Sequence, residues 1–366
     1  MKPAEVPVRY PALDGVRGVA ILLVLLNHNL LWIPFFAKYF YVGVDLFFVL
    51  SGFLITEILI RDAGKPHYFH NFYIKRIFRI LPVYFLVFLL FLCVISLIPD
   101  LSKQFEYYTH NILFYVFYVQ NWASIFKPIG VNNAIFSHFW SLGIEEQFYL
   151  IFPLIVLVLR RGKKLFLFLV SFLILLLIYR FIADTFIPPG DQKFNAAFMT
   201  RFDGICAGAL IAVAKNHTDQ SLQKWLTKIF LGFLSAYFLF TLFMKVFFHS
   251  SGMFYVFGYT ALAFGFGLIV RSALKEDSFF YRILNIRFLK FFGLISYGLY
   301  LIHYPVSVLG KRFVTVRFHW IDVEFNDTLR ATVFSFLMIL ISTGLAYLSF
   351  RYFENPVLKK RKLFLK

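Results

Sequence analysis

The stretch LDGVRGVAILLVLLNHNLLW, residues 13–32, decides the fold class of this chain. It belongs to an apolar run over 18–36, and about 20 predominantly apolar residues are enough to cross a bilayer as a helix. Arg17 precedes this run and His28 lies inside it. Because eleven residues turn a helix through about 1100°, the two side chains share one face and lie about 16 Å apart along the axis. We therefore expect Arg17 at the inner headgroup level and His28 near the middle of a hydrocarbon core about 30 Å thick.

Composition extends this prediction to the whole chain. Of its 366 residues, 60% are hydrophobic and only 15% are charged, whereas soluble domains are about 45–50% apolar and about 25% charged. The sequence predicts an all-α, polytopic transmembrane helical bundle with about ten spans and with both termini in the cytoplasm. The expected spans are 18–36, 41–60, 81–98, 139–159, 165–187, 200–214, 227–248, 253–271, 291–310 and 328–350.

One more apolar segment, YYTHNILFYVFYVQNW at 107–122, is interrupted by polar residues. We expect it to be re-entrant or interfacial, because counting it as a span would invert every later loop. Ten spans with the N-terminus inside place the entire formal charge of +18 on the inner side, as the positive-inside rule requires. Membrane orientation thereby explains the basic character of the chain, and nucleic acid is not an expected partner.

A single membrane domain is expected to fill the chain. Residues 1–17 are predicted to form a cytoplasmic N-terminal segment, 18–353 the transmembrane domain, and 354–366 a basic cytoplasmic tail that contains KKRK. The two cysteines, Cys93 and Cys206, both fall in apolar segments. This placement supports neither a disulfide framework nor a metal site.

Ionisable residues inside membrane spans are costly and are usually functional. Arg17 taken alone is explained by the positive-inside rule, and His28 taken alone by a hydrogen bond to a neighbouring helix. Their shared helix face favours a functional role for both. A second histidine at mid-depth, His303, lies in ISYGLYLIHYPV, where Tyr300 is its neighbour one helical turn earlier.

Two further pairs of charged residues lie near the ends of expected spans. Arg76 and Arg79 share one helix face, where they form either an anchor at the inner surface or a clamp for an anionic group such as phosphate. Glu145 and Glu146 are adjacent and point about 100° apart, so we expect one of them to face the bundle interior. A carboxylate there could orient a histidine and stabilise its charged form; an ion pair, for instance with Arg201, is the structural alternative.

The remaining polar positions have structural and functional interpretations. Ser51, followed by glycine, makes a small polar step that allows either close helix approach or ligand binding. Arg201 and Asp203 lie at the outer end of the sixth expected span. Arg180 and Asp184 are four residues apart in the fifth, and we expect them to pair with each other as a structural contact.

Five motifs together resemble the acyltransferase family 3 membrane proteins and follow that family's order. They are LDGVRGVAILLVLLNH, GVDLFFVLSGFLI, RIFRILPVY, FWSLGIEEQFYL and ISYGLYLIHYPV, and the resemblance continues to the closing FENP. The family's arginine–ten residues–histidine, paired-arginine and serine–glycine–phenylalanine signatures fall on Arg17 and His28, on Arg76 and Arg79, and on Ser51, Gly52 and Phe53. Many members carry a C-terminal extracytoplasmic SGNH hydrolase-like domain, so this chain is expected to be the stand-alone form.

The resemblance implies an integral O-acyltransferase of the bacterial inner (plasma) membrane. Its donor would be cytoplasmic acyl-CoA, usually acetyl-CoA, which is a substrate and not a permanently bound cofactor. Its acceptor would be an extracytoplasmic glycan or lipid-linked sugar, with O-antigen of lipopolysaccharide or exopolysaccharide as the first expectation and peptidoglycan among the alternatives. If acyl relay is required, a separate periplasmic transferase would be a partner.

Under this resemblance the polar residues divide into three groups. Arg17, Arg76 and Arg79 would bind acyl-CoA. His28 would act as general base or accept the acyl group itself, with Glu145, preferred over Glu146, orienting its imidazole. The substrate path would include Asp14, Ser51, Gly52, Phe53, Tyr300, His303, Arg201 and Asp203, and no metal is expected.

Two other function classes compete with this interpretation. A transporter or flippase of lipid-linked sugar would use the same polar groups as a substrate pathway. It explains His28 and His303, but not the inner arginines together with the outer carboxylates. A non-catalytic scaffold of a glycan assembly complex is the third class, and only mutagenesis separates it from an enzyme.

Overall fold

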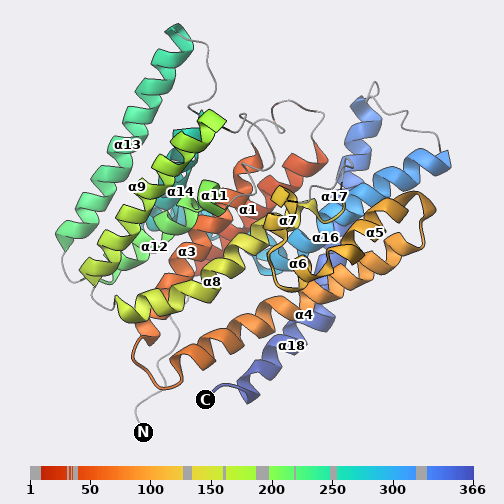
Figure 1. Cartoon of the computed structure of the whole chain (residues 1–366), viewed down its shortest axis with the longest axis horizontal. Coiled ribbons are helices and arrows are strands. Elements are labelled where there is room, and N and C mark those ends of the chain that lie inside the picture. The colour runs from red at the N-terminus through yellow and green to blue at the C-terminus, as the bar shows by residue number, and fades with distance from the viewer. Residues whose placement is uncertain are drawn as a thin grey trace.

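A computed structural model describes residues 10–30, 33, 35, 40–126, 134–159, 162–186, 198–217, 220–247, 254–318 and 328–366. These residues contain helices and no strand, which confirms the all-α fold class. Figure 1 shows the long helices running alongside one another. In chain order the α-helices are α1 (Pro11–Asn29), α3 (Gly43–Asp62), α4 (Tyr68–Ser96), α5 (Ser102–His110), α6 (Ile112–Val116), α7 (Gln120–Phe126), α8 (Trp140–Val158), α9 (Gly162–Phe186), α11 (Phe198–Arg201), α12 (Asp203–Lys215), α13 (Gln220–Phe247), α14 (Tyr259–Ala273), α15 (Phe279–Leu284), α16 (Arg287–Phe318), α17 (Thr328–Ser349) and α18 (Asn355–Lys360).

Eight helical segments are long and apolar enough to cross a membrane, and they coincide with eight of the ten expected spans. The other two, 200–214 and 227–248, correspond to α12 and α13. With 13 residues, α12 extends only about 20 Å, which is less than the hydrocarbon thickness of about 30 Å. It is buried along its whole length up to Ala214, so it is a core helix enclosed by the others.

The interrupted segment 107–122 is divided among three short helices, α5, α6 and α7. The longest of these, α5, has nine residues, which is about half of what a membrane span needs. This agrees with the expectation that the segment does not cross the membrane.

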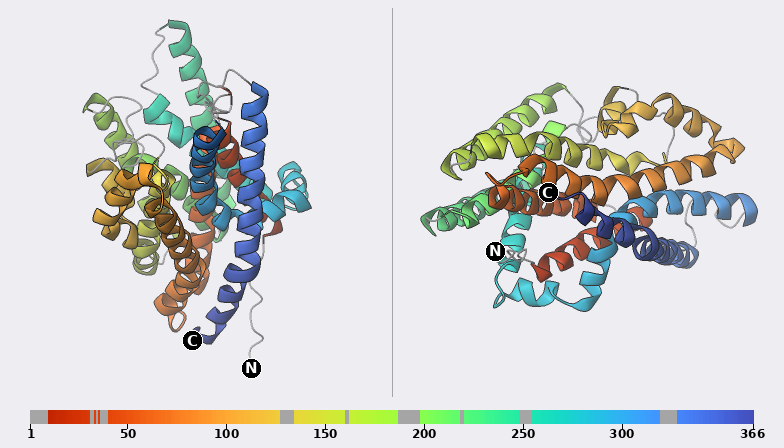
Figure 2. Two further views of the ribbon diagram at one scale, coloured as in Figure 1. Left: turned by 90° about the vertical axis from the view of Figure 1, so that its right-hand side faces the viewer. Right: turned by 90° about the horizontal axis from the view of Figure 1, so that it is seen from below.

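Helices α1 and α3 lie between α9 and α13 on one side of the bundle and α16 and α17 on the other (Figures 1 and 2). α1 packs against both α3 and α16, and α3 packs against α12. Glycines permit the closest of these contacts. A Cβ atom at Gly18 would collide with the backbone carbonyl of Leu289, and one at Gly52 with that of Ile205. The small residues therefore fix the helices that carry the conserved-looking polar groups at backbone-to-backbone distance.

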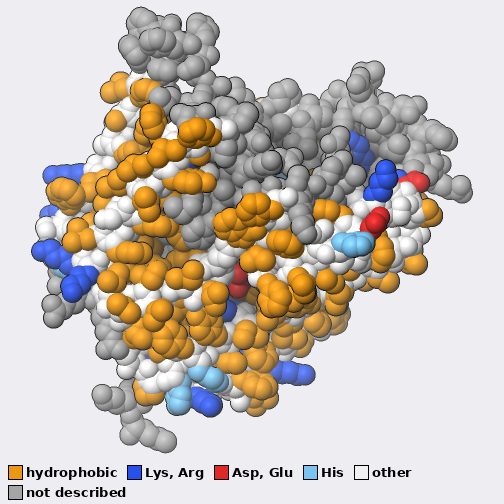
Figure 3. Space-filling view, viewed as in Figure 1, with side chains coloured by type: hydrophobic (Ala, Val, Ile, Leu, Met, Phe, Trp, Pro, Cys, Tyr) orange, Lys and Arg blue, Asp and Glu red, His pale blue; other side chains and the backbone are white. Residues whose placement is uncertain are grey.

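The outer surface of the bundle is apolar. Figure 3 shows hydrophobic side chains spread over the face that includes α8 and α9. Large side chains such as Leu150, Leu154 and Leu167 are more than half exposed. In a membrane these side chains face lipid, whereas the helix backbone satisfies its own hydrogen bonds.

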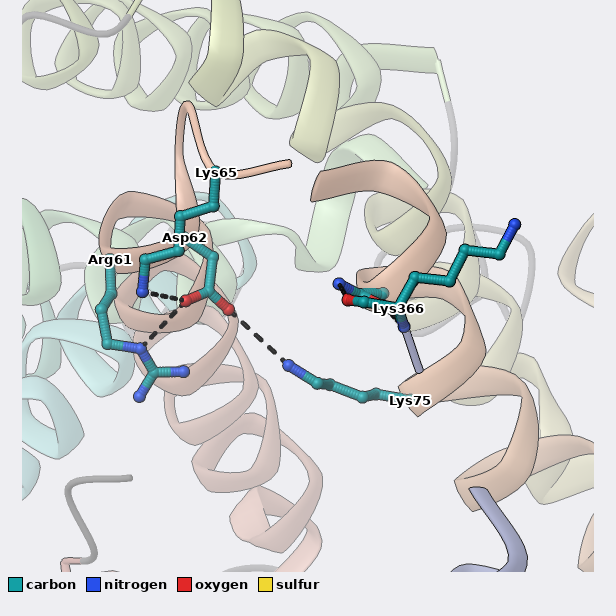
Figure 4. A network of polar contacts seen from close by, with 6 residues as sticks. Arg61, Asp62, Lys65, Lys75 and Lys366 are labelled. Atoms are coloured by element: carbon teal, nitrogen blue, oxygen red, sulfur yellow. Dashed lines mark hydrogen bonds and ion pairs between the residues drawn. The ribbon is translucent and has the colours of Figure 1, made fainter. Parts of the chain in front are cut away.

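The C-terminal residues return to the beginning of α4. The side chain of Asn71 donates a hydrogen bond of 2.8 Å to the backbone oxygen of Lys366 and accepts one of 3.0 Å from its backbone N–H. Close by, the carboxylate of Asp62 at the end of α3 contacts three cations, Arg61, Lys65 and Lys75 (Figure 4). Cations thus outnumber this carboxylate at the bundle end that the charge distribution assigns to the cytoplasm.

Candidate active site

A cavity with an open volume of about 830 Å³ lies between α1, α3, α4, α8 and α16. It contains both charged and hydroxyl groups, although most of the surrounding bundle is apolar. Figure 3 shows acidic and basic side chains together in the middle of an otherwise hydrophobic face. The polar lining residues are Arg17, Ser51, Arg76, Arg79, Ser141, Glu145, Glu146, Tyr149, Ser296, Tyr297 and Tyr300. The fold therefore brings the three predicted acyl-CoA-binding arginines together with both predicted carboxylates.

The three arginines reach the cavity from two helices. Arg17 on α1 forms an ion pair of 3.0 Å with Asp14 one turn earlier. The Arg76 guanidinium lies over the rings of Phe72 and Tyr149, 5.9 and 5.8 Å from their centroids. Its Nε atom is buried and has no hydrogen-bond partner among the described residues. A donor in this state is available to an anionic ligand that enters the cavity.

Glu145 is held by a hydroxyl from a neighbouring helix. Ser51 on α3 donates a hydrogen bond of 2.7 Å to its carboxylate, and Tyr149 donates one of 3.3 Å to the Ser51 hydroxyl. This differs from the expected contact between Glu145 and His28, because the imidazole has another partner, described below. The carboxylate therefore belongs to the arginine-lined cavity.

Both adjacent carboxylates, Glu145 and Glu146, line the cavity, whereas we expected only one to face the interior. A separation of about 100° between neighbouring side chains excludes both from a narrow seam but not from a wide cavity. The correction adds a second acidic group beside the three arginines.

His28 and His303 are in direct contact across α1 and α16. Nδ1 of His28 lies 2.9 Å from Nε2 of His303, and the rings stack with centroids 5.1 Å apart and an interplanar angle of 22°. The other ring nitrogen of His303, Nδ1, lies 2.7 Å from the backbone oxygen of Tyr300 and 3.1 Å from that of Leu299. The two mid-depth histidines predicted separately thus form one hydrogen-bonded pair.

Tyr300 lies between this histidine pair and the cavity. Its ring lines the cavity, while its backbone oxygen contacts His303. Its hydroxyl lies 2.6 Å from that of Ser141 and donates a hydrogen bond of 2.8 Å to the backbone oxygen of His138. His28 is absent from the cavity lining formed by the described residues, so the cavity ends one side-chain layer before the histidine pair.

His138 is a third histidine at this layer, and sequence reasoning missed it. Its ring centroid lies 5.2 Å from that of His303 and 5.3 Å from that of Tyr304. The side chain is buried, and neither ring nitrogen has a hydrogen-bond partner within the described part of the chain. It precedes α8 in a short 3₁₀ turn, Ser137–Phe139, where helical periodicity gives no signal. The burial of an unpartnered imidazole is unusual, but only the tertiary structure reveals it.

Arg201 and Asp203, predicted for the substrate path, lie outside the cavity in two buried ion pairs. Arg201 contacts Asp45 at 3.0 Å and lies over the Tyr259 ring, 4.2 Å from its centroid. Asp203 accepts two hydrogen bonds, of 3.0 and 2.8 Å, from Arg180. Arg180 therefore pairs with Asp203, whereas we expected Asp184, whose side chain lies outside the described residues. Full satisfaction of these charges indicates a structural role.

The remaining predicted path residues also have structural partners. Asp14 pairs with Arg17, as noted above. Gly52 packs against the backbone of α12. Phe53 is fully buried, with its ring centroid 5.8 Å from that of Tyr10. Of the eight predicted path residues, Ser51 and Tyr300 line the cavity, and His303 contacts His28.

Comparison with known proteins identifies the family. A family model described as an acyltransferase domain matches residues 10–347, which includes every segment that lines the cavity and both members of the histidine pair. The chain belongs to acyltransferase family 3. The family model therefore covers the cavity and the histidine pair as parts of one domain.

Individual relatives are peptidoglycan-modifying proteins by name. The chain is 29% identical over 369 residues to the O-acetyltransferase OatA of Staphylococcus aureus (strain NCTC 8325 / PS 47), covering 96% of this chain and 57% of that protein. It is 28% identical over 371 residues to the peptidoglycan O-acetyltransferase OatA of Listeria monocytogenes, covering 95% and 56%. It is 29% identical over 373 residues to the putative peptidoglycan O-acetyltransferase YrhL of Bacillus subtilis, covering 95% and 54%. The chain thus spans little more than half the length of these relatives. No solved structure matches it.

Proposed function

We propose that this protein is a membrane O-acetyltransferase of an extracytoplasmic glycan, with acetyl-CoA as the donor and His28 at the point of transfer. One observation carries the proposal: a single cavity gathers three arginines and two carboxylates and ends at Tyr300, whose backbone contacts the partner of His28. The proposed location is the bacterial plasma membrane, with the arginines toward the cytoplasm.

The donor half of the proposal depends on charge and depth. Arg17, Arg76 and Arg79 would hold the phosphates of acetyl-CoA, because guanidinium groups bind phosphate oxygens in a bidentate manner. The pantetheine arm would then extend along α1 past Ser51 and Tyr300 toward His28, about 16 Å along the helix axis from Arg17. The apolar lining residues, among them Phe47, Phe48 and Leu54, suit an uncharged arm.

The transfer step needs a base on the acceptor side. His28 would remove the proton from a sugar hydroxyl while the oxygen attacks the thioester carbonyl carbon. The C–O bond forms, the C–S bond breaks, and the proton passes to the departing thiolate of coenzyme A. An acyl-histidine route, in which His28 first accepts the acyl group, uses the same residue as a nucleophile.

The acceptor is proposed from the relatives. Those named above are described as O-acetyltransferases, and two of them as acting on peptidoglycan. Peptidoglycan is therefore the first acceptor to test, ahead of O-antigen and exopolysaccharide. A relay through a separate extracytoplasmic transferase is compatible with the same donor site, because the chain spans only part of the length of these relatives.

Membranes containing the protein, incubated with ¹⁴C-acetyl-CoA and soluble peptidoglycan fragments, test the proposal. We expect alkali-labile label in the glycan that depends on both substrates and on the protein. The variant His28→Ala should insert normally and lose transfer, because it lacks the base. Label in the glycan at the wild-type rate from this variant would refute the site assignment, and movement of lipid-linked sugar without label would indicate a transporter instead.

A further inference from the structure

The surroundings of His303 determine which of its ring nitrogens carries the proton. Its Nδ1 faces two backbone carbonyl oxygens, of Tyr300 at 2.7 Å and of Leu299 at 3.1 Å. Carbonyl oxygens only accept hydrogen bonds, so a lone pair on Nδ1 would face two further lone pairs. A proton on Nδ1 instead gives a satisfied donor in a fully buried side chain. His303 is therefore the Nδ1–H tautomer when it is neutral.

This assignment passes to His28 through their shared contact. In the neutral Nδ1–H tautomer the second nitrogen, Nε2, has a lone pair and accepts a hydrogen bond. The atom that it contacts, at 2.9 Å, is Nδ1 of His28. That nitrogen must donate, so neutral His28 also carries its proton on Nδ1 and leaves the lone pair on Nε2. Within the described structure, His303 is the only side chain that hydrogen-bonds the His28 ring.

We propose that His303 is a positioning residue that holds His28 in the Nδ1-protonated tautomer and thereby presents the His28 Nε2 lone pair for proton abstraction. This inference rests on the proposed function and adds the atom that performs the step. The role is that of the third group of a nucleophile–base–orienter arrangement, in which a hydrogen bond to one ring nitrogen sets the tautomer of the other. Here a neutral imidazole fills the position that a carboxylate usually occupies.

The proton balance follows from this arrangement. The hydroxyl proton of the acceptor moves to Nε2 of His28, which becomes an imidazolium with both nitrogens protonated. Its Nδ1–H bond to His303 Nε2 becomes a charge-assisted hydrogen bond, so His303 stabilises the charged intermediate without itself changing protonation state. The Nε2 proton is then released to the thiolate of coenzyme A, and the neutral pair is restored.

Transfer assays on purified full-length protein in detergent provide the first test. His303→Leu removes the acceptor for His28 Nδ1–H, so we expect kcat to fall by about 10²- to 10⁴-fold, in the range seen when a triad histidine loses its tautomer. The KM for acetyl-CoA should change little, because His303 does not line the arginine cavity. His303→Gln retains a carbonyl acceptor and should recover part of the loss. Adding His303→Leu to His28→Ala should cost nothing further, because the two residues act as one unit.

The control variant is His110→Leu. This histidine is exposed on α5 and, like His303, has its Nδ1 on a backbone oxygen, that of Glu106 at 2.8 Å. We expect wild-type kcat from it. A similar kcat loss in both leucine variants, or equal activity of His303→Leu and the wild type, would overturn the proposal.

¹⁵N NMR of histidine-labelled protein tests the tautomer without any activity. The protein has nine histidines, and the His28 resonances are identified as those that disappear in His28→Ala. We expect wild-type His28 to show a protonated Nδ1 and an unprotonated Nε2, and His303→Leu to shift it toward a tautomer mixture. A proton on Nε2 of neutral wild-type His28 would refute the proposal even if acetyl transfer is confirmed, whereas the expected spectrum with no transfer activity would refute only the proposed function.

Discussion

The hydroxyl of Ser51 donates a 2.7 Å hydrogen bond to the carboxylate of Glu145 and so joins α3 to α8 inside the cavity. Few other polar contacts connect these two helices across a space that a ligand must enter. The contact places a negative charge beside the arginines proposed to bind the donor. It therefore controls how much of the positive charge of the cavity remains for the donor phosphates.

Replacing Ser51 with alanine should weaken transfer. A hydrogen bond to a charged group is worth about 1.5–3 kcal/mol, so we expect transfer to fall by about tenfold or more as Glu145 reorients toward the arginines. The measurement is kcat/KM for acetyl-CoA. Ser296→Ala is the matched control, because this hydroxyl also lines the cavity but bonds only the backbone oxygen of Gly293. Equal effects of the two substitutions would contradict a specific role for the Ser51–Glu145 contact.

Removing the paired arginines should affect donor binding more than chemistry. In Arg76→Gln and Arg79→Gln, we expect the KM for acetyl-CoA to rise about tenfold or more, because each variant loses charge-assisted bonds to phosphate. Lysine at either position should restore only part of the affinity, since it lacks the planar fork. Arg351→Gln removes an exposed positive charge and should leave the KM unchanged. An unaltered KM in both cavity variants would show that the arginines are only topological anchors.

The buried ion pair between Arg180 and Asp203 should be essential for folding. Asp203→Asn leaves an uncompensated charge on Arg180, whose side chain is 0% exposed, and breaking such a pair costs about 3–5 kcal/mol. We expect a marked loss of folded protein and a lower thermal midpoint in detergent. Asp100→Asn breaks the pair with Arg312, in which Asp100 is 65% exposed, and surface pairs contribute about 0–1 kcal/mol. Its thermal midpoint should match that of the wild type; comparable losses in both variants would argue against this assignment.

The close approach of α3 and α12 gives a prediction about packing. In Gly52→Ala the added methyl group would collide with the backbone oxygen of Ile205, and forced overpacking typically costs about 1–3 kcal/mol. We expect a lower thermal midpoint and a moderate loss of activity. Gly344→Ala, where a Cβ meets open space, should be neutral or slightly stabilising because alanine favours helix. A Gly52→Ala protein as stable as the wild type would show that the helices can separate without cost.

Much of the cavity was predictable because helical periodicity relates residues that are close in sequence. The spacing of Arg17 and His28 on one face depends only on the helix repeat, and the same holds for Arg76 and Arg79. Adjacency misled at one point: Glu145 and Glu146 were expected to face different environments, but a cavity wider than one helix face admits both.

The partnerships between helices were not predictable in the same way. His28 and His303 are 275 residues apart, and no local pattern indicates that their rings meet. Arg180 had a local candidate partner in Asp184, yet it pairs with Asp203 through the packing of α9 on α12. Tertiary contacts override a sequence-local pairing whenever a buried charge finds a better-oriented partner.

The contact of Gly18 with the backbone of Leu289 leaves α1 no room to slide along α16. The rise of α1 then becomes a fixed length, about 16 Å from Arg17 to His28, against which any donor is measured. A donor whose acyl group is attached directly to its phosphate, such as acetyl phosphate, would be bound by the arginines with its acetyl group too far from His28 to react. Under the proposed function, the helix acts as a ruler that selects donors by the reach of their carrier arm.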